Sequence, residues 1–423
     1  MKKLALLLLS ATLTGGAFAA QPLDSIPERA VILSGNESNP EHLANITELY
    51  SRENMAFQDP AAPRFLFLDK QGKVALGIGG YLKASAMYDM DGAIASNGFT
   101  TYDIPVPFDP AQRQRFGATA NHSTIFLKMV TQKTRFGRVI VYMQGNFTGN
   151  NGGYGFKMSQ AYVSVGNVTL GLARSTFADG PAMAPTVDDE GPSGQVTRKN
   201  MLVKYTTPSY RGLSAALSVE LPSITMTTGT EAASISQRVP DIPAYVQYAW
   251  NGGASHLRLS GIYRGISYRD LKSGRNEIAS GWGVQLSGVG KIVGGLGFFG
   301  HYTYGKGIAT YVNDLGGDGF DLIPSETAGR LKPAAVSGWT AGLQYNFNPK
   351  FFVSASYSQA NLFKASGMGT DTYRYAQYAV VNAFYNVWGD LQLGLEYIHG
   401  ARHDYSGLSG HANRVDAMLQ FSF

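Results

Sequence analysis

The residues with the clearest chemical potential in this 423-residue sequence are four carboxylates in one loop-like stretch. Asp179, Asp188, Asp189 and Glu190 fall within twelve residues of a segment, 175–198, that is otherwise rich in glycine, proline and alanine. Glycine and proline favour turns over regular strands or helices, so these acids lie on an irregular chain. They could line a charged passage, or they could simply be hydrated on an exterior loop. The residues alone leave both interpretations open.

The second chemically notable group is basic. Acids and bases facing each other across a narrow channel create a transverse field that orients polar solutes, because low-dielectric walls weaken screening. Strand alternation places several arginines, together with Glu220, on inward faces, whereas Arg138 and Arg198 flank strands and could equally bind lipid headgroups or lie on turns. The candidate pore-wall bases are Arg113, Arg115, Arg138, Arg198, Arg258 and Arg264.

Enzymatic chemistry has little support in the sequence. There is no cysteine, and the seven histidines are scattered without a Gly-x-Ser-x-Gly elbow or a paired base. His399 and His403, with Asp404, have a spacing that could bind a metal, but they lie across the end of a strand and a loop, and solvated loop histidines explain them better. The segment 313–321 has too few ligands for calcium. We therefore predict no catalytic residue, no metal and no cofactor.

The N-terminus predicts export. Lys2 and Lys3 precede the apolar run 4–9 and the small-x-small pattern of 17–19, which is typical of a signal peptide ending at residue 19. Removing this peptide leaves 33 of the 35 basic side chains against 30 acidic ones, a net charge of about +3. This balance argues against nucleic acid as a partner.

From residue 73 onward the sequence alternates between apolar and polar side chains, which predicts strands with one lipid face and one water face. The last strand is the clearest example, because Val415, Leu419 and Phe421 share one face while Arg414 and Asp416 share the other. Sixteen strands are predicted, at 73–89, 112–132, 138–148, 156–165, 168–174, 199–207, 212–221, 243–250, 254–268, 279–289, 294–306, 335–347, 351–363, 373–387, 390–402 and 411–423.

The connections between these strands alternate in length. Short turns such as 166–167 and 348–350 alternate with long stretches such as 175–198 and 307–334, the pattern of a transmembrane barrel with short periplasmic turns. One strand changes its apolar parity between Phe116 and Ile125, which predicts a bulge or kink around 121–123. The fold class is therefore an all-β, transmembrane antiparallel barrel of about sixteen strands. A repeating blade motif, which a soluble propeller needs, is not found.

Residues 20–72 have a different character. A short helical pattern follows Pro40, with Leu43, Ile46 and Leu49 at three- and four-residue spacing. We interpret this segment as a short periplasmic N-terminal extension, either a flexible linker or a packed plug or trimer contact. The predicted organisation is signal peptide 1–19, extension 20–72 and barrel 73–423.

Several motifs resemble those of DcaP-like trimeric porins of Gram-negative bacteria. They are Gly77-Ile78-Gly79-Gly80-Tyr81-Leu82-Lys83-Ala84, Arg113-Gln114-Arg115-Phe116-Gly117, Ser175-Thr176-Phe177-Ala178-Asp179 and the terminal Phe423. The resemblance implies a trimeric barrel in which the third loop folds inward and narrows the pore opposite basic wall residues. Residues 20–72 depart from it, since they show no sustained heptads of the kind the family often carries.

These observations predict an outer-membrane porin for passive diffusion of small hydrophilic solutes and ions, with acidic lips at Asp179, Asp188, Asp189 and Glu190. The lumenal arginines suggest a weak anion preference. The alternative is a plugged barrel with a binding, adhesin-like or structural role. Expected partners are the lipid bilayer, lipopolysaccharide, two further copies of the chain and the barrel-assembly machinery, for which Phe423 is the candidate signal.

Overall fold

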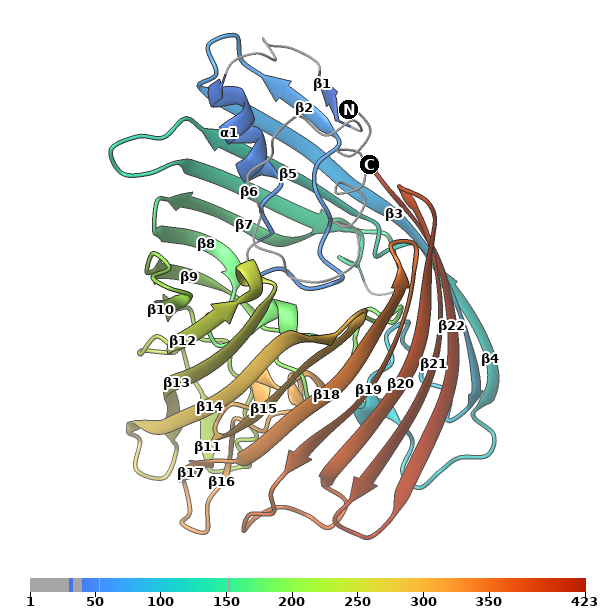
Figure 1. Cartoon of the computed structure of the whole chain (residues 1–423). Helices are drawn as coiled ribbons and strands as arrows, with labels where there is room; N and C mark the ends of the chain where they lie inside the picture. The colour runs from blue at the N-terminus through green and yellow to red at the C-terminus, as the bar shows by residue number, and fades with distance from the viewer. Residues whose placement is uncertain (1–29, 33–39, 53, 151–152) are drawn as a thin grey trace.

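The computed structural model describes residues 30–32, 40–52, 54–150 and 153–423, so the predicted signal peptide lies outside the described residues. Sixteen spanning strands form one closed antiparallel barrel (Figure 1), as the sequence predicts. The barrel closes where β22 pairs with β3. The spanning strands are β3 (Val74–Asp91), β4 (Arg113–Thr119) with β5 (Thr124–Thr131), β6 (Val139–Asn146), β7 (Lys157–Val165), β8 (Val168–Arg174), β9 (Lys199–Thr206), β10 (Leu213–Glu220), β12 (Ile242–Trp250), β13 (Ser255–Asp270), β14 (Asn276–Val293), β15 (Leu296–Lys306), β18 (Ala335–Asn348), β19 (Phe351–Leu362), β20 (Tyr373–Trp388), β21 (Leu391–Asp404) and β22 (Ser409–Ser422).

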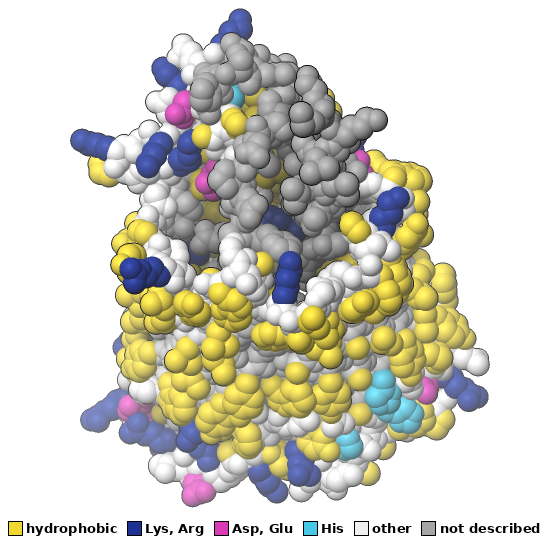
Figure 2. Space-filling model, in the orientation of Figure 1, with side chains coloured by type: hydrophobic (Ala, Val, Ile, Leu, Met, Phe, Trp, Pro, Cys, Tyr) yellow, Lys and Arg dark blue, Asp and Glu magenta, His cyan; other side chains and the backbone are white. Residues whose placement is uncertain are grey.

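The alternation in the sequence becomes an alternation in burial. On β13, Leu257 and Leu259 are 50% and 60% exposed, whereas Arg258 between them is 4% exposed. Apolar side chains form a band across the outer face of the barrel that Figure 2 shows. Successive side chains of a strand point to opposite faces. The polar neighbours of the lipid-facing residues therefore point into the lumen.

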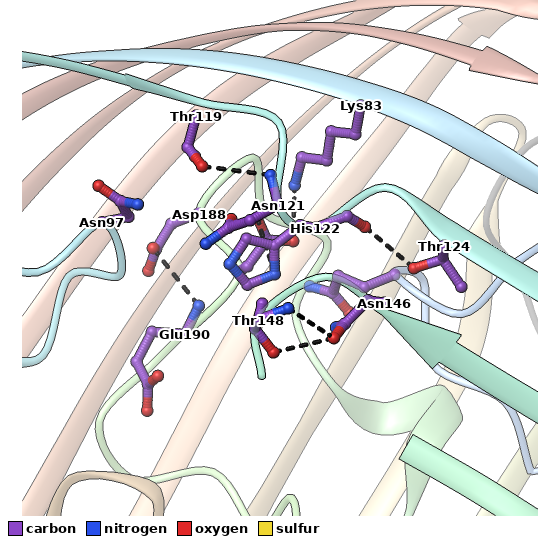
Figure 3. Close-up of polar contacts among 12 residues, drawn as sticks. Lys83, Asn97, Thr119, Asn121, His122, Thr124, Asn146, Thr148, Asp188 and Glu190 are labelled. Atoms are coloured by element: carbon purple, nitrogen blue, oxygen red, sulfur yellow. Dashed lines mark hydrogen bonds and ion pairs between the residues drawn. The ribbon is translucent and has the colours of Figure 1, made fainter. Parts of the chain in front are cut away.

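The predicted irregularity in the second spanning strand is confirmed. β4 and β5 both pair with β3, and they are separated by a turn in which Ser123 N donates to Ala120 O at 3.1 Å. Phe116 before the turn and Ile125 after it are both exposed, although their numbers have opposite parity. The break therefore keeps the apolar residues on the outer face although they change from even to odd numbers. It also turns Asn121 and His122 into the lumen (Figure 3).

The connections have unequal lengths at the two ends of the barrel. The short turns lie at the end that carries both described termini and α1 (Figure 1), which is the periplasmic end in barrels of this kind. The longer loops at the opposite end contain the small strands β11 (Ala232–Ser234), β16 (Leu322–Pro324) and β17 (Leu331–Pro333). Single-turn 3-10 helices occur at Thr101–Asp103, Gly180–Ala182, Asn251–Gly253, Ala309–Tyr311 and Asn313–Leu315.

The described residues that precede β3 pack at the end of the barrel that carries the short turns. The helix α1 (Pro40–Leu49) occurs where the spacing predicts one, and its Ile46 and Leu49 are buried against Leu66 and Val130. The strand β1 (Val31–Ile32) runs parallel to β2 (Phe65–Leu68), which pairs with β3. Among the residues described, no helix is both long and apolar enough to span a membrane.

The C-terminal residue lies at the seam of the barrel. Gly80 N donates to Phe423 O at 2.8 Å, and Phe423 N donates to Gly80 O at 3.0 Å. A side chain at Gly79 would approach both Phe423 O and the ring of Phe126 to less than 3 Å, so this residue must be small where the last strand meets the first. The role of Phe423 as an assembly signal stays a prediction.

Candidate functional site

The stretch 175–198, which joins β8 to β9 and is called loop 3 below, folds inside the barrel. Asp179 holds its first part against the opposite wall, where His256 Nε2 and Ser287 Oγ lie 2.8 and 2.6 Å from its Oδ2. Arg258 Nη1 lies 3.5 Å from its other oxygen. Burial disfavours the ionised carboxyl, but Arg258 and His256 outweigh this and hold the pKa of Asp179 below its usual range.

The middle of loop 3 is bound to β20 and β21. Val187 N and Asp188 N each donate to the carboxylate of Glu396 at 2.9 Å. Asn382 Nδ2 bridges this contact by donating to Pro185 O and to Glu396. Buried main-chain N–H groups need hydrogen-bond acceptors, and an irregular loop lacks the acceptors that a helix or sheet provides. Glu396 supplies them for Val187 and Asp188.

The last part of loop 3 lies directly on β18 and β19. Gly194 N donates to Ser358 Oγ at 2.8 Å, and Gly194 O lies 3.0 Å from His301 Nε2. A side chain at Gly194 would come within 3 Å of the backbone of Trp339 and Gln359. The glycine therefore permits the contact that brings the loop flat against the wall.

The tip of loop 3 faces the wall made by β3 and by the break between β4 and β5. Lys83 Nζ lies 2.7 Å from Asp189 Oδ1 and donates to Val187 O at 2.8 Å. His122 Nδ1 lies 3.5 Å from the other oxygen of Asp189. Polar side chains gather around the same space (Figure 3). They are Asn97, Thr119, Asn121, Thr124, Asn146 and Thr148.

Glu190 differs from the other three acids of the loop. Within the described part of the chain its carboxylate has no ion-pair partner and accepts no hydrogen bond. Asp188 has no ion pair there either, but it accepts from Phe99 N and Gly191 N. Burial, together with the nearby charges of Asp188 and Asp314, raises the pKa of Glu190 to about 7. The tip of loop 3 therefore carries a carboxyl whose charge changes near neutral pH.

The predicted basic residues fall into separate groups. Arg258 meets Asp179 of loop 3. Arg264 is fully buried between Asp241 and Asp321, at 3.1 and 3.0 Å, and it connects the loops after β10 and β15 to the wall. Arg198 contacts Ser223 at the base of loop 3. Among the predicted arginines, Arg258 is therefore the one that pairs with an acid of loop 3.

The other predicted bases lie away from the tip. Arg115 pairs with Asp89 at 3.3 Å and binds carbonyls of the loop after β3, and Arg113 is exposed on β4. Arg138 contacts Asn45 of α1 at the periplasmic rim. Glu220 accepts from Thr176 N at 2.9 Å and so supports the start of loop 3.

Sequence reasoning did not select Lys83, His122, His256 or Glu396. The alternation of side-chain facing along the strand could have placed Lys83 in the lumen, because it lies between the outward-facing Leu82 and Ala84. The same signal existed for Glu396, between the outward-facing Leu395 and Tyr397. His122 carried no such signal, since it lies in the break where alternation fails.

The closed barrel, its apolar belt and the charged loop inside it define the class of fold, a transmembrane β-barrel built like the porins. More particularly, residues 68–212 match the family model of the DcaP outer membrane protein, which confirms the resemblance found in the motifs.

Solved structures agree with this fold. The outer membrane channel DcaP of Acinetobacter baumannii is similar with a TM-score of 0.72 and 19% identity, over 84% of this chain and 99% of that one. The anion-selective porin from Comamonas acidovorans has a TM-score of 0.52 and 13% identity, over 83% and 100%. A trimer form of OmpT of Vibrio cholerae has 0.50 and 8%, over 83% and 100%. The sequence matches no curated protein.

Proposed function

We propose that the protein lets small hydrophilic solutes and ions diffuse passively through the lumen, past the constriction that loop 3 forms inside the barrel. The observation that supports this most is the charged tip of loop 3 inside the barrel, where Asp189 meets Lys83 and His122 of the wall. Charges held at a narrow point select solutes by sign and orientation. Transport of this kind runs down a gradient and needs no cofactor.

The sign of selectivity depends on which lumenal charges remain unpaired. Arg258 and Arg264, from which an anion preference is expected, each lie beside at least one carboxylate. Glu190 has no such counterion among the described residues, so its ionisation adds net negative charge at the tip. We propose a preference that moves toward cations as Glu190 ionises.

Conductance in a planar bilayer under a salt gradient tests the proposed function. Current steps from the purified, heat-modifiable barrel would support a channel, and the reversal potential would report the sign of its selectivity. If correctly folded wild-type protein and variants with a wider lumen both carry no current, the proposed function is contradicted.

The assembly is part of the same proposal. We propose a homotrimer in the outer membrane, with lipid and lipopolysaccharide around the apolar belt and with Phe423 read by the barrel-assembly machinery. The trimer form of a structurally similar barrel supports this, and current steps in groups of three would test it. Residues 20–72 are proposed as the periplasmic part, and 73–423 as the barrel.

A second candidate function has its own supporting observation. The chain between α1 and β2 enters the barrel at the periplasmic mouth, as a plugged barrel with a binding, adhesin-like or structural role would require. The two candidates differ in conductance, since a permanently plugged barrel stays silent under all conditions.

A further inference from the structure

The segment 54–63, called the plug loop below, leads from the region after α1 to the start of β2 near Phe65. Both ends are held at the periplasmic rim, because α1 packs on β3 and β5 while β2 pairs with β3. Between these ends the chain reaches into the lumen, where Gln58 Nε2 donates to Ala184 O and to Thr186 Oγ1 of loop 3 at 3.2 and 2.8 Å.

One contact of the plug loop is a buried ion pair. Asp59 Oδ2 lies 2.7 Å from Arg174 Nη2, and the two side chains are 6% and 7% exposed. Ala56 N donates to the same oxygen at 2.8 Å. Burial opposes the charge of this carboxyl, but Arg174 and Lys199 outweigh it and lower the pKa of Asp59 to about 2. The contact is therefore ionic at any physiological pH.

A second contact lies on another part of the wall. The ring of Phe57 packs edge-on against Phe352 of β19 and Phe384 of β20, with centroid distances of 5.9 and 5.0 Å. The next residue, Gln58, accepts a hydrogen bond from Tyr81 Oη of β3 at 3.0 Å. Asn54 Oδ1 accepts from Arg258 Nη1 of β13 at 3.1 Å.

These partners come from β3, β8, β13, β19 and β20, which lie at different positions around the barrel, so the plug loop crosses the lumen rather than following one wall. Two cavities remain beside Phe57, of about 290 and 70 Å³. Residues of the plug loop line both cavities, so this loop divides the space at this level of the lumen.

We propose that the plug loop is an autoinhibitory gate, closed in this structure by the Asp59–Arg174 pair and the Phe57 contacts, and that the pore opens when residues 54–63 withdraw to the periplasmic side. The proposal rests on the channel function proposed above. Its distinctive feature is that a short loop, tethered at both ends, can leave the lumen without unfolding the barrel.

The first test uses single-channel recording of the full chain with Asp59→Asn, Arg174→Gln and Phe57→Ala. We expect each variant to raise the open probability several-fold, and the Asp59→Asn/Arg174→Gln double variant to add little to either single one, because both changes remove the same pair. Asp371→Asn, the same chemical change on an exposed residue after β19, is the matched control and should behave as wild type. Heat-modifiable mobility verifies folding of each variant.

The second test locks the gate, which is feasible because the chain contains no cysteine. Gln58→Cys/Thr186→Cys, linked by a short bifunctional thiol reagent that reductant cleaves, should stay closed when linked and open after reduction. Either single cysteine, treated in the same way, is the control.

The outcomes separate this proposal from the channel function. Linked and reduced protein that conduct equally well, or open variants that match wild type, would overturn the gate and leave the channel. Silence in wild type, in all three single variants and after reduction would overturn the channel itself. Low conductance in the linked form with recovery after reduction supports both.

Discussion

Loop 3 and the plug loop both cross the lumen as irregular chain, but they are held in different ways. Loop 3 is bound along its whole length, with Asp179 on β13 and β14, residues 187 and 188 on Glu396, and Gly194 on Ser358. It also contributes Phe177, Ala178, Met183 and Val196 to the largest apolar cluster. The plug loop is shorter. It is held by one buried ion pair, by the two ring contacts of Phe57, by Ala56 in the same apolar cluster and by hydrogen bonds of Asn54 and Gln58.

This difference indicates that a segment does not stay in the lumen permanently just because it lies deep inside it. A loop whose main-chain and side-chain groups are satisfied at many points cannot leave without exposing all of them. A loop held at a few points near an open mouth can exchange those contacts for water. We therefore expect loop 3 to define the pore and the plug loop to control access to it.

The largest expected effect comes from breaking loop 3 at its first anchor. Asp179→Ala leaves Arg258 and His256 buried without their carboxylate, and loss of one partner of a buried ion pair costs ~3–5 kcal/mol. We expect a clear drop in the temperature at which the folded barrel converts to the heat-denatured form on gels. An unchanged transition would contradict the anchoring role.

The corresponding change in the plug loop should cost much less stability. Asp59→Asn also breaks a buried pair, but withdrawal of the loop lets Arg174 regain water, which limits the cost to about 1 kcal/mol, as for an exposed pair. The same heat-modification assay checks this value. A loss as large as that of Asp179→Ala would show that the two loops are equally fixed.

Lys83→Met should make the tip of loop 3 more negative. It removes the cation 2.7 Å from Asp189, so that His122 is the base that remains beside this carboxylate. A unit charge about 4 Å away in water-like surroundings contributes about 1 kcal/mol, which corresponds to a roughly five-fold shift of the permeability ratio toward cations. Reversal potentials measure this ratio. Lys364→Met, in the loop after β19, is the control and should leave the ratio unchanged.

The smallest effect is a pH dependence of selectivity. Because the pKa of Glu190 is raised to about 7, this carboxyl is about one-tenth ionised at pH 6 and about nine-tenths ionised at pH 8. Raising the pH adds negative charge at the tip, so the reversal potential should move toward cation preference over this interval. Asp59, with a pKa of about 2, stays ionised throughout and contributes no change. Glu190→Gln should remove the shift, and a shift of equal size in that variant would assign it to another group.

Much of the architecture could be predicted because it depends on local pattern. Alternation at Leu257, Arg258 and Leu259 assigns their faces, and the parity change between Phe116 and Ile125 locates the break in the strand. The partners of the acids could not be predicted in the same way. Asp179 meets His256 and Ser287, which lie 77 and 108 residues away in the sequence, and only closure of the barrel and the inward fold of loop 3 bring them together.

The sequence by itself determined the strand number, the facing of side chains, the unequal loops and the concentration of acids in loop 3. These follow from a two-residue period and from turn residues, each read over a few positions. Only the tertiary structure decided that Glu190 lacks a counterion among the described residues, that Arg264 lies buried between Asp241 and Asp321, and that residues 54–63 lie inside the barrel. These features arise from contacts between segments distant in sequence, whose geometry no local pattern encodes.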